Sequence, residues 1–206
     1  NDSFIDFIHR TTPEAEVYFL ANRKDRPEKV TATFRQTGRQ PELWNPMTGE
    51  QRDLPQFKME NSRTAVPLEF DPNGSMFVVF RKPTTATAGE GSNFPTLEIS
   101  QTLEGPWTVQ FDKEWFYPTD GLTGEAAEGK LVFEKLEDWS KRPEEAVKHF
   151  SGTAVYEKVF SFQSSVFSKD KSFHLDLGMV GHSVKVTLNG KDLGVVWCNP
   201  RRVDIT

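Results

Sequence analysis

Carboxyl groups are the side chains of this chain best suited to acid–base chemistry, since 30 Asp and Glu occur among its 206 residues. Hydrolysis of a glycosidic bond, for example, needs two carboxyl groups about 5–10 Å apart on either side of the sugar. Glu134 with Glu137, and Glu144 with Glu145, are neighbours in sequence, but each pair lies in a polar stretch. Because acidic side chains are mostly solvated, we interpret both pairs as surface charges.

Nucleophilic and metal-binding motifs are absent from the sequence. The four histidines show no spacing of the H-x₃₋₅-H or HExxH type, which metal sites commonly use. The lone cysteine, Cys198, follows an apolar run and is interpreted as a small core residue. Neither a G-x-S-x-G turn nor a phosphate-binding glycine loop occurs. We therefore predict no catalytic residue and no metal ligand in this chain.

A set of aromatic and polar side chains is suited to binding instead. Sugar sites pair an aromatic ring, which covers the C–H face of the sugar, with Asn, Asp or Arg groups that bind its hydroxyls. Trp107 and Trp197 follow the alternation of strands, so we expect them in the core. Trp115 and Trp139 lie outside any alternation and are the better candidates for exposed rings. The predicted carbohydrate-binding residues are Trp115, Tyr117, Trp139, Asn199 and Arg201.

The elements that must position these residues are predicted to be strands. Val30, Ala32 and Phe34 alternate with polar residues, and residues 173–177 do the same, which is the period of a half-buried strand. Pro- and Gly-rich turns separate these runs, and only residues 143–148 suggest a helical turn. An aromatic content of 12% also favours packed sheets. The fold class predicted is all-β, with two β-sandwiches.

The sequence Asn189-Gly190 predicts a β-hairpin, because both central residues of a type I′ turn need positive φ. With that turn, simple register places Val186 opposite Leu193 and Val184 opposite Val195. Every apolar partner would then lie on one face of the hairpin.

A stretch of small and polar residues between Pro83 and Pro95 predicts a linker. The predicted organisation is a β-sandwich at 1–83, a linker at 84–94 and a second module at 95–206. The formal net charge of −5 argues against a nucleic-acid partner, and no apolar run is long enough for a membrane span. The chain begins at Asn1 without a Met and stops at Thr206 within an apolar/polar alternation, so we interpret it as a piece of a longer protein.

Several of these runs resemble a known family. The second module is similar to the sugar-binding-like jelly roll of glycoside hydrolase family 2, which recurs in large bacterial α-L-rhamnosidase-type glycosidases. The first is similar to the β-sandwich that precedes the jelly roll in the rhamnosidase-type proteins. The residues that carry the resemblance are 8–10 (IHR), 18–22 (YFLAN), 41–50 (PELWNPMTGE), 74–80 (GSMFVVF), 150–160 (FSGTAVYEKVF), 175–178 (LDLG), 184–194 (VKVTLNGKDLG) and 197–206 (WCNPRRVDIT).

The resemblance implies C-terminal, non-catalytic β modules of a bacterial glycoside hydrolase. In such proteins the catalytic carboxylates belong to a separate (β/α)₈ barrel, expected here upstream of Asn1, so no catalytic residue is carried over. It also implies a galactose-binding-like jelly roll truncated at its C-terminus, a periplasmic or cell-surface location, and a catalytic domain of the same polypeptide as partner. Cofactors are not expected, although jelly rolls of this type often hold a structural calcium ion.

Two functions stay open at this point. The first is an accessory region that supports the catalytic domain of an enzyme acting on plant or host polysaccharide. The alternative is a stand-alone carbohydrate-binding or adhesion protein. An independent enzyme of another chemistry is the third and least favoured interpretation.

Overall fold

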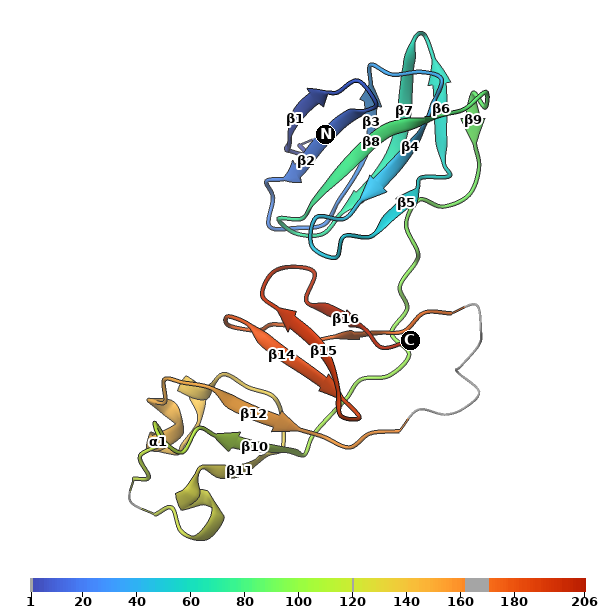
Figure 1. Ribbon diagram of the computed structural model, residues 1–206. Helices are drawn as coiled ribbons and strands as arrows, with labels where there is room; N and C mark the ends of the chain where they lie inside the picture. The colour runs from blue at the N-terminus through green and yellow to red at the C-terminus, as the bar shows by residue number, and fades with distance from the viewer. Residues whose placement is uncertain (1, 120, 162–170) are drawn as a thin grey trace. The chain divides into compact units, whose positions relative to one another are not determined.

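The computed structural model describes residues 2–119, 121–161 and 171–206 (Figure 1). Its contacts divide into two compact units, Asn1–Leu97 with Asp170–Thr206, and Glu98–Lys169. Strands dominate both, and the strand pairs of the described residues are antiparallel. The all-β prediction is therefore confirmed. None of the helices in the described ranges is long and apolar enough to cross a membrane.

Two facing sheets form a sandwich in the first 97 residues (Figure 1). The five-stranded sheet has the order β1-β2-β8-β4-β5, and the four-stranded sheet has the order β3-β7-β6-β9. The strands are β1 (Ile5–Thr11), β2 (Glu16–Asn22), β3 (Glu28–Phe34), β4 (Arg39–Trp44), β5 (Gln51–Asp53), β6 (Phe57–Glu60), β7 (Arg63–Phe70), β8 (Ser75–Pro83) and β9 (Ala88–Gly89).

Alternation along the strands builds the sandwich core. In β7, every second side chain from Thr64 to Phe70 is buried, as the period of two of a half-buried strand requires. Tyr18 of β2 meets Phe34 of β3 edge-on, with ring centroids 4.8 Å apart, and Phe80 of β8 completes the aromatic cluster. Aromatic contacts between the two sheets thus hold the sandwich together.

The second half of the predicted linker is packed against the sandwich. Ala88 and Gly89 form β9, which pairs with β6. The Asn93 side chain is 3% exposed and bonds to the backbone of Gln56 and Pro67. Small residues permit this approach, because a Cβ on Gly89 would lie 2.0 Å from the Pro55 carbonyl oxygen. Residues 88–94 therefore contact the first module, while the three-part division of the chain stays a prediction.

The Glu98–Lys169 unit contains a three-stranded sheet of order β11-β10-β12. Its core combines apolar side chains of the sheet with Phe116, Ala146 and Val147. The predicted helical turn is confirmed as α1, which buries Ala146 and Val147. The elements are β10 (Trp107–Phe111), the 3₁₀ helices η1 (Gly124–Glu128) and η2 (Trp139–Lys141), β11 (Lys130–Phe133), α1 (Glu145–Lys148) and β12 (Ala154–Glu157).

Two strand pairs make up the C-terminal segment. β13 (His174–Asp176) pairs with β16 (Arg202–Asp204), and β14 (Val184–Leu188) pairs with β15 (Lys191–Val196). Asn189 and Gly190 join β14 to β15 with φ values of 51° and 80°. The predicted hairpin turn is thus confirmed, because positive φ at both positions is what a type I′ turn requires.

The predicted register of this hairpin is wrong beyond its turn. An irregularity lies between Lys185 and Thr187, and it places Val184 opposite Val196 instead of Val195. Gly194, at φ 90°, lies on the facing strand, where an extra residue forms a bulge. Val195 and Trp197 are consequently exposed, at 57% and 64%. The expectation that Trp197 lies in the core is therefore also wrong.

Candidate functional site

A loop after β10 exposes two of the predicted aromatic residues. The backbone N–H groups of Trp115 and Phe116 both donate to the Asp112 carbonyl, which turns the chain back at the end of the strand. Phe116 is buried and stacks on Phe111, with centroids 5.4 Å apart. Its neighbours Trp115 and Tyr117 are 60% and 71% exposed. The buried ring therefore anchors a loop that presents an aromatic side chain on either side of it.

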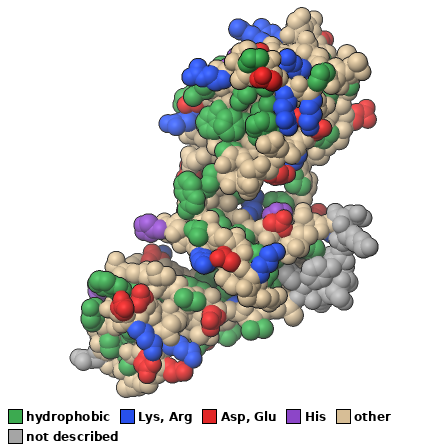
Figure 2. Space-filling view, in the orientation of Figure 1, with side chains coloured by type: hydrophobic (Ala, Val, Ile, Leu, Met, Phe, Trp, Pro, Cys, Tyr) green, Lys and Arg blue, Asp and Glu red, His purple; other side chains and the backbone are tan. Residues whose placement is uncertain are grey.

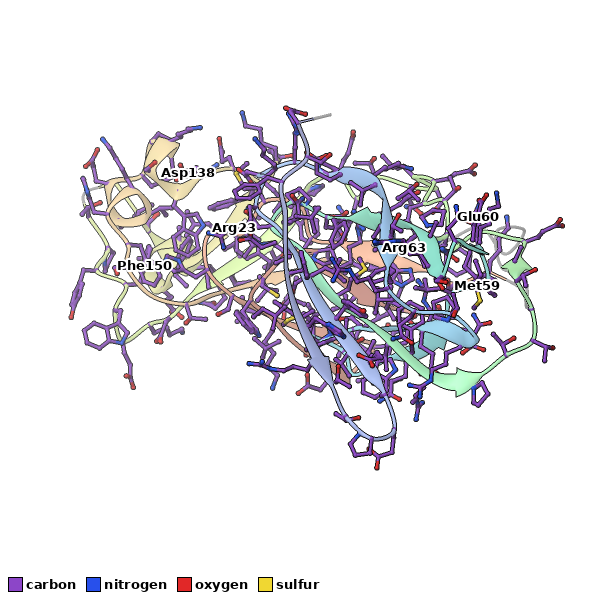
Figure 3. The ribbon with its side chains drawn as sticks, turned by 90° about the horizontal axis from the view of Figure 1, so that it is seen from above. Arg23, Met59, Glu60, Arg63, Asp138 and Phe150 are labelled. Atoms are coloured by element: carbon purple, nitrogen blue, oxygen red, sulfur yellow. The ribbon has the colours of Figure 1, made fainter. Side chains whose placement is uncertain are left out.

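Trp139 has a different environment from Trp115 and Tyr117. It is half-buried, and its indole Nε1–H donates to the Tyr156 hydroxyl at 2.5 Å. Its ring meets Phe111 and Phe150 edge-on, at 5.3 and 5.6 Å between centroids. The expectation of an exposed Trp139 is therefore wrong, because its ring fills a gap in the aromatic core and its polar atom is already bonded. Phe150, whose ring packs against Trp139, is labelled in Figure 3 and belongs to the Glu98–Lys169 unit.

Asn199 and Arg201 lie together at a polar cavity of about 190 Å³. The cavity is lined mainly by the turn at Asp71, the end of β13 and the start of β16. Arg202 Nε donates to Asp176 Oδ2 at 2.9 Å, directly across the β13–β16 pair. Arg202 Nη1 also lies 3.7 Å from Asp71 Oδ1. The cavity thus offers carboxylate, amide and guanidinium groups, which are the kinds of group that bind sugar hydroxyls.

The charges at this cavity are stabilised as an ion pair. Burial acts to raise the pKa of Asp176, but hydrogen bonds from Arg202 and from the Gly178 N–H outweigh it and lower the pKa. Arg201 donates to the Val180 carbonyl, which holds its guanidinium beside the chain. Asp176 is therefore an ionised acceptor at neutral pH, and Arg202 is its permanent counter-ion.

Sequence reasoning overlooked Asp71, Asp176 and Arg202 as members of one site. The signal that could have joined the last two is charge complementarity between the alternating runs at 172–177 and 202–206. Their pairing, however, depends on strand register, which sequence periodicity does not fix.

Three of the acidic residues considered for catalysis, Glu137, Glu144 and Glu145, are engaged in ion pairs. Arg142 donates to Glu137 at 3.0 Å and to Glu144 at 2.7 Å, and its guanidinium lies 4.2 Å from the Phe133 ring centroid. Arg142 holds the pKa of Glu137, and Lys148 that of Glu145, below the usual value of a glutamate. A glycosidase general acid needs the opposite shift.

The described residues also contain no group of three or more His, Cys, Asp or Glu side chains that could hold a metal ion. At the polar cavity, the Arg202 guanidinium already lies 2.9 Å from Asp176 and 3.7 Å from Asp71, the carboxylates that a cation would need. The residues at this cavity therefore do not fit the structural calcium ion that jelly rolls of the resembled type often hold.

Fold and surfaces together define an all-β module with an exposed aromatic loop and a polar cavity. The family model described as alpha-L-rhamnosidase, of glycoside hydrolase family 106, matches residues 1–59. The solved structure of a rhamnosidase from Novosphingobium sp. PP1Y is similar over 99% of this chain, with 33% identity and a TM-score of 0.85. A curated protein of Formosa agariphila, named "Putative beta-glucuronidase", is 38% identical over 104 residues, or 50% of the chain.

These likenesses confirm the resemblance inferred from the sequence: the chain is a glycoside hydrolase-associated module. It spans 18% of the Novosphingobium rhamnosidase chain and 8% of the Formosa protein. The match to residues 1–59 falls within the first sandwich, whose motifs the sequence already compared with rhamnosidase-type proteins.

Proposed function

We propose that this chain is a non-catalytic accessory region of a longer glycoside hydrolase acting on plant or host polysaccharide. Its β modules, of which the second is proposed to be a galactose-binding-like jelly roll, would support a catalytic domain of the same polypeptide. The observation that carries the proposal is the likeness of 99% of this chain to only 18% of a rhamnosidase. The lowered pKa values of Glu137 and Glu145 add to it, because a general acid at neutral pH needs a raised pKa.

The purified 206-residue chain tests this proposal directly. We expect no hydrolysis of aryl α-L-rhamnosides or aryl β-glucuronides above a buffer blank at any pH between 4 and 9. Hydrolysis that survives repurification and is lost in Asp176→Asn would contradict the proposal. A second arm mixes this chain with the remainder of its parent polypeptide and measures the thermal stability of that remainder, which we expect to rise.

A second candidate function is direct binding of carbohydrate by the aromatic loop, in an accessory or a stand-alone protein. The observation in its favour is the exposure of Trp115 and Tyr117 beside a buried anchor, Phe116. Calorimetric titration with oligosaccharides tests it. Micromolar binding that is lost in Trp115→Ala and Tyr117→Ala, but kept in Val132→Ala, would favour this function. Val132 is a suitable control because it is 58% exposed and lies on β11 of the same unit.

The polar cavity is the other proposed carbohydrate contact. Asn199→Ala would remove only a side-chain amide from its lining. Arg201→Ala would remove a guanidinium from the lining and, in addition, break the hydrogen bond to the Val180 carbonyl. We therefore favour Asn199→Ala in the same titrations. A periplasmic or cell-surface location is proposed with this function, because glycosidases of the type it resembles act there, and fractionation of a producing bacterium tests it.

A further inference from the structure

Strand β1 forms an exposed edge of the five-stranded sheet. All seven of its residues pair with β2, and no other strand of the described residues pairs with it (Figure 1). Six of the seven are exposed, including Phe7 at 68% and Ile8 at 56%. A long edge strand with exposed apolar side chains is a template for pairing with another chain.

Hydrogen bonds at the two ends of the β1–β2 ladder show which backbone groups of β1 bond to β2 and which point away from it. Arg23 N–H donates to the Phe4 carbonyl, and Thr12 N–H donates to the Ala15 carbonyl. Because such bonds alternate along an antiparallel pair, the even-numbered residues of β1 direct their N–H and C=O groups toward β2. The odd-numbered residues direct theirs away from it. These are Ile5, Phe7, His9 and Thr11.

We propose that this edge binds the β1 strand of a second copy of the chain, antiparallel, about a two-fold axis at Ile8. In that register Phe7 pairs with His9 of the second copy, and Ile5 pairs with Thr11. All four residues of these two pairs are odd-numbered. The hydrogen-bonded pairs across the contact therefore use the backbone groups of β1 that point away from β2. The seven-residue overlap is complete, and the contact is self-complementary, as two-fold interfaces must be.

Charge supports this register over its neighbours. Asp6, Ile8 and Arg10 share one face of β1, because side chains alternate along a strand. The proposed axis places Asp6 opposite the second copy's Arg10, twice, on either side of an Ile8–Ile8 contact. A slip of two residues in either direction would place one of these charges opposite Ile8 instead. Opposite charges in facing positions stabilise strand pairs, and like charges destabilise them.

The groups needed for this contact are accessible. Asp6 lies 3.5 Å from Arg23 Nε, but both side chains are more than half exposed, so that ion pair is weak. On the same face of the sheet, Ile8 of β1 lies opposite Phe19 of β2, and Phe19 lies opposite Phe77 of β8. These three side chains form an apolar row across the strands. Figure 2 shows hydrophobic side chains gathered on the surface of the first β-sandwich, with Lys and Arg side chains around them. Pairing at β1 would extend this apolar row across the two-fold axis.

The test is the mass of the 206-residue chain by sedimentation equilibrium over a range of concentrations. We expect a reversible dimer of twice 23.5 kDa. Asp6→Arg and Arg10→Asp each create two like-charge pairs, and each is expected to weaken the dimer about tenfold or more. A mixture of the two variants should form a heterodimer, because each charge again faces its opposite. The double variant carrying both changes should also dimerise with itself.

Arg63→Asp is the matched control, because Arg63 is an exposed arginine on β7 of the other sheet (Figure 3). It changes the net charge as Arg10→Asp does, and it should leave the mass unchanged. Circular dichroism of each variant confirms that the fold is kept. A chain that is monomeric at its highest soluble concentration would overturn the proposal. So would single variants that dimerise normally, or variants that fail to pair when mixed.

Discussion

Arg81 covers the carboxylate of Glu42 on the five-stranded sheet of the sandwich. Its Nε donates to Glu42 Oε2 at 2.8 Å, and Glu42 is 1% exposed. The same guanidinium lies 5.1 Å from the Trp44 ring centroid. Trp44 Nε1 and the Lys82 ammonium complete the environment of the carboxylate, at 3.0 and 2.9 Å. A buried charge in the sandwich is thus held by two hydrogen-bond donors and by the nearby ammonium of Lys82.

Arg81→Ala should destabilise the sandwich by about 2–3 kcal/mol. Removing one partner of a buried ion pair costs about 3–5 kcal/mol, and we reduce this because Arg81 is 42% exposed and Lys82 stays in place. Urea unfolding at pH 7 measures the change. Arg23→Ala, which removes a cation from an exposed pair, should change the stability by less than about 0.5 kcal/mol. Equal effects in the two variants would contradict this prediction.

The stability contributed by Glu42 should depend on pH. Burial acts to raise the pKa of this carboxyl, but hydrogen bonds from Arg81, Lys82 and Trp44 outweigh it, so its pKa is lowered in the folded state. Its contribution is therefore present above the unfolded pKa of about 4.3 and is lost as the pH falls through the folded pKa. Glu42→Gln should flatten the fall in unfolding free energy between pH 5 and pH 3, measured by urea titration. An unchanged slope would contradict this.

Asn93→Ala should destabilise the sandwich although Asn93 lies in a segment predicted to be a linker. The Asn93 side chain makes three hydrogen bonds to the backbone of Gln56 and Pro67, at 2.7–2.9 Å. Leaving these buried groups unpaired should cost about 2–4 kcal/mol, seen as a lower urea midpoint. Glu90→Ala, an exposed neighbour, should have little effect. Equal, small effects would mean that the segment contributes nothing to the fold.

Trp139→Phe should change both the stability and the titration of Tyr156. Burial raises the pKa of Tyr156, and the hydrogen bond from Trp139 partly offsets this. Without that bond the pKa of Tyr156 should rise further, which ultraviolet titration of the phenol detects. We expect a loss of about 1–2 kcal/mol for one buried hydrogen bond and some packing. Trp115→Ala should change neither quantity, because Trp115 is 60% exposed. A Tyr156 pKa that falls would contradict the assignment.

Local sequence determined the strands and the turn between β14 and β15. Alternating apolar residues predicted the half-buried strands β3 and β13, and Asn189-Gly190 predicted a turn whose residues both have positive φ. The motifs also identified a glycoside hydrolase-associated module. The strands and the turn depend on backbone preference and on side-chain period, which neighbouring residues fix by themselves, whereas the module was identified by its resemblance to known motifs.

Tertiary structure decided which aromatic rings are exposed and which charges meet. Trp139 is half-buried because Tyr156 and Phe150, distant in sequence, surround it. Trp197 is exposed because one extra residue near Gly194 shifts the strand that precedes it. Asp176 meets Arg202 only through the register of β13 and β16. A shift of one residue turns a side chain to the opposite face of a sheet, so exposure and pairing depend on long-range register that local periodicity does not encode.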